Sequence, residues 1–119
     1  MECTTNKYFC VRNTNNKGRG LFATRCIIKG TIIEISHTIE ELRSLLQPNN
    51  ILGIYSFENK FDKTKILIAL GFGSLFNHDN NPNVDWKVIK KGKFIRFKAL
   101  KDIWPREELL INYGYDPIF

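Results

Sequence analysis

Three short stretches hold the residues best suited to bind a small molecule and assist a reaction. In Lys17-Gly18-Arg19-Gly20, two glycines flank a cation just before an apolar run. Glycine permits close backbone approach, so exposed N–H and C=O groups there can meet a ligand. Asn77-His78 supplies directional polar groups where a second apolar run stops. Tyr113 offers an apolar ring and a hydroxyl that donates or accepts hydrogen bonds.

Each of these stretches also has a plain structural explanation when it is taken alone. The glycine pair fits a tight turn, Asn77-His78 fits the end of a buried strand before an Asx-type turn, and Tyr113 fits packing at a domain edge. The glycine pair is not a phosphate-binding loop, because it lacks the Walker spacing and no helical pattern follows it. Their occurrence together, in this order, favours a shared ligand site.

Length and composition restrict the class of protein. The chain of 119 residues fits one domain, and 43% hydrophobic residues can fill its core. No apolar run approaches the roughly 20 residues of a membrane span, and the polar N-terminus lacks a signal-peptide core. We therefore expect a soluble, intracellular domain without membrane contact. Cys3, Cys10 and Cys26 form no CxxC pair, which argues against a disulfide framework and a structural zinc site.

The chain is basic, with a net charge of +6 and a pI near 9.3. Such a balance suggests an anionic neighbour such as nucleic acid, an acidic surface or a phosphate-bearing ligand. The densest cationic group is Lys87, Lys90, Lys91 and Lys93, around a predicted hairpin turn. A solvated hairpin tip is the simpler explanation of this group.

Short β-branched and apolar runs separated by turn residues predict a mainly β domain. The expected strands are residues 8–12, 20–23, 31–36, 55–57, 65–70, 84–90, 94–99 and 108–112. One helix is predicted over residues 38–46, with Thr38 as N-cap and Glu41 completing a capping box. Its apolar face would hold Ile39, Leu42, Leu45 and Leu46.

Read in order, the motifs resemble the SET-domain family of protein lysine methyltransferases. The matching residues are Gly18-Arg19-Gly20-Leu21-Phe22, then Phe76-Asn77-His78 with Pro82-Asn83, and finally Glu107-Glu108-Leu109 with Tyr113. The resemblance extends over nearly the whole chain, so we expect one SET domain over residues 1–119, without the zinc-binding pre-SET and post-SET regions. The run Leu70-Gly71-Phe72-Gly73 is most similar to the minimal SET proteins of large DNA viruses.

The resemblance implies a SET fold of several small β-sheets, with one or two short helices and a C-terminal pseudoknot. In this pseudoknot the C-terminal segment is threaded under a preceding loop, which would bring Asn77-His78 next to Tyr113. It also implies S-adenosylmethionine as cofactor and no metal. The residues implied to bind the cofactor are Lys17, Gly18, Arg19, Gly20, Asn77, His78, Tyr113 and Phe119.

The implied reaction is methyl transfer from the sulfonium of the cofactor to a neutral lysine amine. A nearby sulfonium and an apolar channel both lower the pKa of a substrate lysine, so no strong general base is needed. Tyr113 is the implied catalytic residue and would orient the amine. Candidates for the walls of the lysine channel are Tyr115, Tyr55 and Trp86. Asp79-Asn80 departs from the pattern usual after Asn-His in this family.

The implied substrate is a histone tail, such as that of histone H3, or another lysine-bearing peptide. Because these tails are basic too, the domain must attract them through local acids, for which Glu40, Glu41, Glu58, Asp62 and Asp85 are available. The basic surface can instead contact nucleosomal DNA. A homodimer is also compatible with this family, and a viral protein of this kind would act in the host nucleus.

Two alternatives of other classes stay open. A catalytically silent SET-like module would bind cofactor or peptide without methyl transfer. A small basic β-domain would bind nucleic acid, which requires exposed aromatic residues among basic ones.

Overall fold

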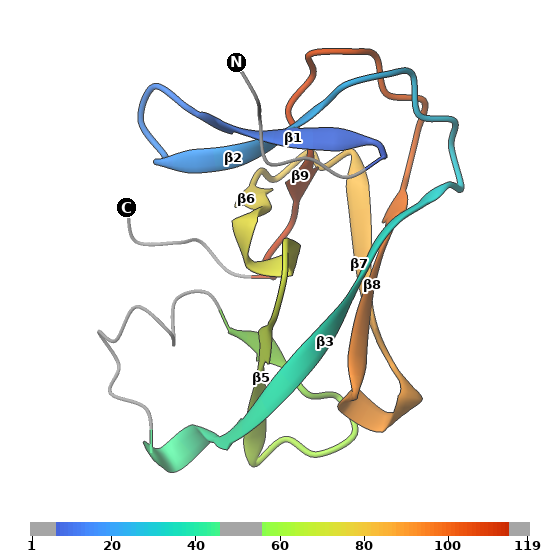
Figure 1. Ribbon diagram of the computed structural model, residues 1–119. Coiled ribbons are helices and arrows are strands. Elements are labelled where there is room, and N and C mark those ends of the chain that lie inside the picture. Colours follow the sequence, from blue (N-terminus) through green and yellow to red (C-terminus); the bar gives the residue numbers. More distant parts are fainter. Residues whose placement is uncertain (1–6, 46–55, 115–119) are drawn as a thin grey trace.

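Nine short strands form three small sheets in the computed structural model, which describes residues 7–45 and 56–114 (Figure 1). The prediction of a mainly β domain built from several small sheets is confirmed. The strands are β1 (Phe9–Asn13), β2 (Arg19–Ala23), β3 (Ile32–Leu42), β4 (Phe57–Glu58), β5 (Lys65–Ala69), β6 (Asn77–His78), β7 (Val84–Ile89), β8 (Phe94–Ala99) and β9 (Leu110–Ile111).

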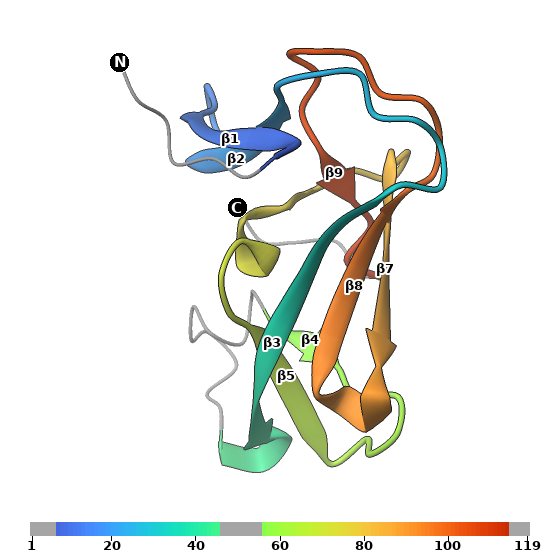
Figure 2. The same ribbon diagram turned by 45° about the vertical axis from the view of Figure 1, so that its right-hand side comes forward.

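The largest sheet has five antiparallel strands in the order β4-β5-β3-β8-β7. Strands β1 and β2 form a separate hairpin, and β6 pairs with β9 in parallel. Figures 1 and 2 show the β1–β2 hairpin across one end of the large sheet, with β6 and β9 close to it. Residues from distant parts of the chain therefore meet at this end of the molecule.

The core joins the three sheets through aromatic side chains. Along β8, the buried Ile95, Phe97 and Ala99 alternate with half-buried residues, as expected for a strand with one solvent-facing side. Phe76 stacks on Phe97 with ring centroids 4.2 Å apart and also contacts Phe9 of β1 edge-on. Because Phe76 directly precedes β6, this buried contact fixes the position of Asn77-His78.

The predicted helix over residues 38–46 is wrong. Strand β3 continues to Leu42 and pairs Thr38–Leu42 with β5, and only the short 3₁₀-helix η1 (Arg43–Leu45) follows. The Thr38 hydroxyl, expected to cap the helix, donates to the carbonyl of Gly92 instead. Ile39 and Leu42, expected on a buried face, are 52% and 43% exposed. Pairing with a distant strand thus overrides the local helical pattern.

The apolar run after β5 is also not a continued strand. Strand β5 ends at Ala69, and the 3₁₀-helix η2 (Gly73–Leu75) leads into β6. A third 3₁₀-helix, η3 (Lys90–Gly92), forms the predicted turn between β7 and β8. Within residues 7–45 and 56–114, no helix has the length and apolar character needed to cross a membrane.

Candidate active site

The parallel pairing of β6 with β9 brings the second and third motifs together. Asn77 lies opposite Leu110, and His78 lies opposite Ile111. The side chain of Asn83 reinforces this pair, because its Nδ2 donates to the carbonyl of Glu108 at 2.9 Å and its Oδ1 accepts from the N–H of Leu110 at 2.8 Å. Two short strands of two residues each are thereby held in register.

Asn77 connects all three motifs through its side-chain amide. Its Nδ2 donates to the carbonyl of Arg19 at 3.1 Å and to Oε2 of Glu108 at 2.8 Å, and the residue is only 3% exposed. Both amide hydrogens are therefore used within the protein. Asn77 can therefore contact a ligand only through its Oδ1 or its backbone.

The two glycines of the first motif serve different purposes. Gly20 is buried, and a Cβ built there would lie 2.6 Å from Oε2 of Glu108 and 2.7 Å from Nδ2 of Asn77. Gly18 is exposed with a φ of +72° and has open space around it. The N–H and hydroxyl of Thr14 both donate to the Gly18 carbonyl, at 2.7 and 2.8 Å, and close the loop. Gly18 thus suits an exposed turn, whereas Gly20 permits contact between the motifs.

Glu108 is a site residue to which the sequence patterns assigned no role. Its carboxylate accepts from Asn77 and lies 3.7 Å from the Nζ of Lys17, and the side chains of Lys17 and Glu108 are both half-buried. Backbone hydrogen bonds between β2 and residues 107–109 fix its place beside Gly20. The only sequence signal was its position within the motif Glu107-Glu108-Leu109. Arg19 contributes its carbonyl to this junction, and its side chain is exposed.

His78 positions Tyr113. Its Nδ1 accepts a hydrogen bond from the backbone N–H of Tyr113 at 2.9 Å, and its Nε2 lies 3.0 Å from Oδ1 of Asn80. Because Nδ1 accepts this hydrogen bond, the ring can donate from Nε2 to the amide oxygen of Asn80. The two rings lie 5.0 Å apart at a tilt. Asn80, where the chain departs from the family pattern, thus stabilises the tautomer that holds Tyr113.

The hydroxyl of Tyr113 donates to the carbonyl of Phe76 at 2.9 Å, and its ring is half-buried. A phenol whose proton is directed to a carbonyl can act as acceptor toward the N–H of an approaching amine. This arrangement suits the orientation of a neutral amine. It requires no proton transfer by the tyrosine itself.

A cavity of about 370 Å³ lies beside Tyr113. Its walls include Trp86, Glu58, Lys60 and Arg43. Trp86 is held by a hydrogen bond from its Nε1 to the carbonyl of Asn112 at 2.8 Å, and its face is 5.6 Å from the Nζ of Lys60. Trp86, predicted as a channel wall, is thus placed next to Tyr113.

The other predicted channel and cofactor residues, Tyr55, Tyr115 and Phe119, lie outside the described residues. Of the five acids considered for substrate attraction, Glu58 lines the cavity next to Tyr113. Glu40 and Asp62 contact Lys65 instead. Asp85 is exposed on β7, next to Trp86 along the strand but on the opposite face of the sheet.

Comparison with known proteins agrees with this geometry. The SET-domain family matches residues 18–114, a range that includes all three motifs, and the chain therefore belongs to the SET-domain family. The chain is also similar to a Schizosaccharomyces pombe protein named histone-lysine N-methyltransferase, H3 lysine-37 specific. The two sequences are 38% identical over 108 residues, and the match covers 87% of this chain and 71% of that protein.

The fold is similar to the crystal structure of a Plasmodium falciparum protein that is provisionally assigned as a histone methyltransferase. The TM-score is 0.78 at 28% sequence identity, and the match covers 94% of this chain and 97% of that one. Together these comparisons confirm the prediction of an enzyme of the lysine methyltransferase class.

Proposed function

We propose that the protein transfers a methyl group from S-adenosylmethionine to the side-chain amine of a histone lysine, in the tail of histone H3. The observation that carries the proposal is the Tyr113 hydroxyl, held against the Phe76 carbonyl beside a cavity and next to the junction of the three motifs. The similarity to a yeast histone H3 methyltransferase supports the choice of substrate.

The donor set where the first and third motifs meet fits S-adenosylmethionine. The amino-acid end of this cofactor carries one carboxylate and one ammonium, and Lys17 and Glu108 offer a partner of each sign, 3.7 Å apart. The exposed Gly18 adds backbone groups at the same loop. When bound, the cofactor supplies an activated methyl group on a positively charged sulfur.

The protein's own residues act by alignment. Tyr113 orients the amine through its hydroxyl oxygen, and His78 holds the Tyr113 backbone in place. Trp86 forms a rigid apolar wall, so the aliphatic part of a lysine can lie against it while the amine meets Tyr113. Alignment of two reacting groups can by itself provide much of a rate enhancement.

Glu58 gives the cavity a local acid in an otherwise basic domain. It lies on the same cavity as Tyr113, together with Lys60 and Arg43. An exposed carboxylate next to the target lysine attracts a substrate that carries a further basic residue nearby, as histone tails do. We therefore expect Glu58→Gln to raise the KM for a tail peptide and to leave kcat nearly unchanged.

The test is incubation with methyl-labelled S-adenosylmethionine and an H3 tail peptide, core histones or nucleosomes, followed by mass spectrometry. Methyllysine on H3, with loss of most of it in Tyr113→Phe, is the expected result. Cofactor binding without methyl transfer to any of these substrates would support the silent-module alternative. Methylation of other histones only would contradict the choice of H3.

Several finer points extend this proposal. The likeness to minimal viral SET proteins, and with it action in the host nucleus, stays a prediction from residues 70–73. A homodimer and a single domain over residues 1–119 stay predictions as well. Size-exclusion chromatography with light scattering distinguishes a dimer from a monomer.

A further inference from the structure

Nearly all of the net charge of the chain lies on one hairpin. Residues 84–99, which form β7, η3 and β8, contain six of the 18 basic residues and one of the 12 acidic ones. The hairpin carries a net charge of +5 out of a total of +6, and the other 103 residues together carry +1. The six cations, here called the hairpin cations, are Lys87, Lys90, Lys91, Lys93, Arg96 and Lys98.

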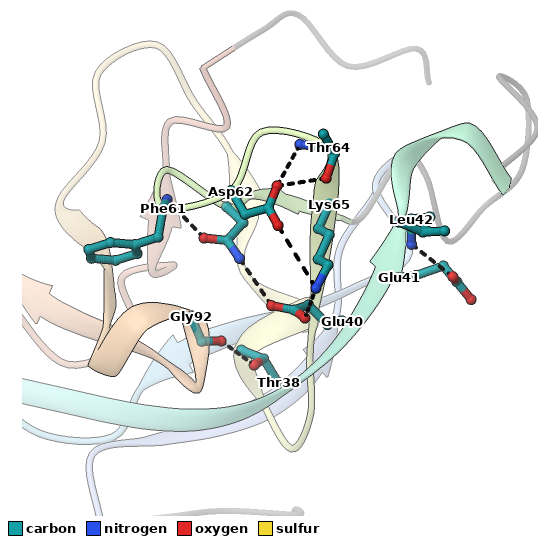
Figure 3. Close-up of polar contacts among 10 residues, drawn as sticks. Thr38, Glu40, Glu41, Leu42, Phe61, Asp62, Thr64, Lys65 and Gly92 are labelled. Carbon is teal, nitrogen blue, oxygen red and sulfur yellow. Dashed lines mark hydrogen bonds and ion pairs between the residues drawn. The ribbon is translucent and has the colours of Figure 1, made fainter.

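Among the residues that the structure describes, none of the hairpin cations forms an ion pair. The nearby acid Glu40 is engaged elsewhere, because it accepts from the Nζ of Lys65 at 3.0 Å and from Nδ2 of Asn59 at 3.2 Å (Figure 3). The hydrogen bond to Glu40 raises the pKa of Lys65 above its ordinary value. Asp62 is likewise bound by Thr64.

The hairpin cations also carry structural costs. Lys87 lies directly opposite Arg96 across β7 and β8, and like charges in such cross-strand pairs are destabilising. The Nε of Arg96 is buried without a hydrogen-bond partner in the described part of the chain. Lys90 and Lys91 have φ angles of 52° and 56°, in the left-handed region where asparagine and glycine are favoured. The residue types at these positions therefore oppose local stability.

Lys87, Arg96 and Lys98 lie on the solvent-facing side of β7 and β8, and Lys90, Lys91 and Lys93 lie at the tip of the hairpin. The single acid of the hairpin, Asp85, lies on the same side, opposite Lys98. Arg96, Lys98 and Phe94 alternate along β8 on its solvent-facing side. Phe94 lines a hollow of about 450 Å³ at the hairpin tip together with Lys91 and Lys93. The active-site cavity lies on the other face of the sheet, since Trp86 points to the side opposite Lys87.

We propose that the solvent-facing side and tip of the β7–β8 hairpin bind the phosphate backbone of double-stranded DNA. Phosphates that lie against this surface pair with the free charges and reduce the repulsion between Lys87 and Arg96. Their attraction also compensates for the cost of lysines in left-handed conformation. Binding there leaves the active-site cavity accessible, because the two surfaces lie on opposite faces of the same sheet.

Lysine content, and the packed state of the aromatic ring on the solvent-facing side of β8, distinguish duplex DNA from other anions. Recognition of acidic or phosphorylated peptides typically uses arginine clusters, whereas five of the six hairpin cations are lysines. Single-stranded nucleic acid is usually held by exposed aromatic rings. Here the half-buried Phe94 already packs against His37 with ring centroids 4.7 Å apart.

The test measures binding to a short DNA duplex of random sequence by fluorescence anisotropy over a range of salt concentrations. If five or six hairpin cations contact phosphates, log K falls against log salt with a slope of about −4.5 to −5.5. Lys90→Asn with Lys91→Gly removes two contacts, which reduces the slope by about 1.8 and weakens binding about 30-fold at about 0.15 M salt. Since the new residues suit the turn, the same variant should have a higher Tm.

The matched control is Lys29→Gln with Lys101→Gln, which also removes two positive charges from exposed positions, here near the end of β8 away from the hairpin tip. This control should keep the wild-type slope. Equal loss of DNA binding in both variants, or no binding by the wild type, would overturn the proposal. So would stronger binding to polyglutamate or to single-stranded RNA than to the duplex.

A second measurement compares methylation of nucleosomes with methylation of a free tail peptide, and it rests on the proposed function. The hairpin variant should raise the KM for nucleosomes several-fold and leave the KM for the peptide unchanged. Loss of DNA binding without a change in either KM would refute the link to the enzyme's substrate. Intact DNA binding without methyl transfer would instead refute the proposed function.

Discussion

Gly20→Ala tests the contact on which the site depends. The added methyl group would lie 2.6 Å from Oε2 of Glu108 and 2.7 Å from Nδ2 of Asn77. Real Cβ atoms essentially never make contacts this short, so both of these side chains must move. Movement of either one breaks the hydrogen bond of 2.8 Å between them. The backbone of Gly20 does not require glycine, because its φ is not among the positive values.

The magnitude follows from three contributions. Crowding a packed interior with one methyl group costs about 1–3 kcal/mol. Loss of a hydrogen bond to a charged group costs about 1.5–3 kcal/mol. The smaller entropy of alanine in the unfolded chain offsets roughly 0.4–1 kcal/mol. We expect a decrease of about 2–5 kcal/mol in the free energy of unfolding, or about 8–20 °C in Tm.

The assay is thermal unfolding followed by circular dichroism, with Gly18→Ala as the matched control. Gly18 has a φ of +72° and open surroundings, so alanine there costs only about 1–2 kcal/mol. In a Glu108→Ala background one of the two clashing atoms is absent, and Gly20→Ala should cost less than in the wild type. A Gly20→Ala protein as stable as the wild type, or fully additive costs with Glu108→Ala, would refute the reasoning.

Three further predictions concern Tyr113, its hydrogen-bond partner His78, and the dependence of stability on acidic pH. Tyr113→Phe removes the hydroxyl that donates to the carbonyl of Phe76, and the rate of labelled methyl transfer should fall about 10²–10³-fold with little change in Tm. A rate within twofold of wild type would contradict the role of this hydroxyl in orienting the amine. His78→Leu leaves the Tyr113 N–H without its acceptor, and calorimetry should show a loss of about 1–3 kcal/mol together with a lower kcat; unchanged kcat would exclude a positioning role. Hydrogen bonds from Thr64 lower the pKa of Asp62 below 3.8, so their contribution to stability is complete above that pH and is lost as the pH falls through the folded-state pKa. The Tm difference between wild type and Thr64→Val should therefore shrink toward zero below about pH 3.8. A Tm difference that stays constant with pH would contradict this prediction.

Local sequence patterns predicted the strands well where neighbouring residues decide the structure. Strand β8 has the predicted bounds, and the turn between it and β7 falls at residues 90–93 as expected. The predicted helix at Thr38 failed for the opposite reason. Its capping and periodicity are local, whereas the pairing of β3 with β5 joins residues that are more than 20 positions apart. Short-range patterns carry no information about such partners.

The site was accessible from sequence only through the family resemblance. The parallel pairing of β6 and β9 involves two residues on each side, which is too short for any periodicity to indicate. The hydrogen bond from Asn77 to Glu108 spans 31 positions. Motif order therefore suggested that these segments meet, but the role of Glu108 became clear only from its contacts.

The junction explains why the three motifs are informative together and weak alone. Asn77 can satisfy its amide only if a carbonyl from the glycine loop and a carboxylate from the third motif are both present. Glu108 can approach only if Gly20 has no side chain, and Lys17 balances its charge. Each residue type is thus required by the other two segments. A single motif found without its partners would leave the buried amide of Asn77 or the half-buried carboxylate of Glu108 without a partner, or the glycine at position 20 unexplained. The same contacts place His78 and Tyr113, which lie on or just beyond the two paired strands, so the structural junction and the position of Tyr113 depend on one another.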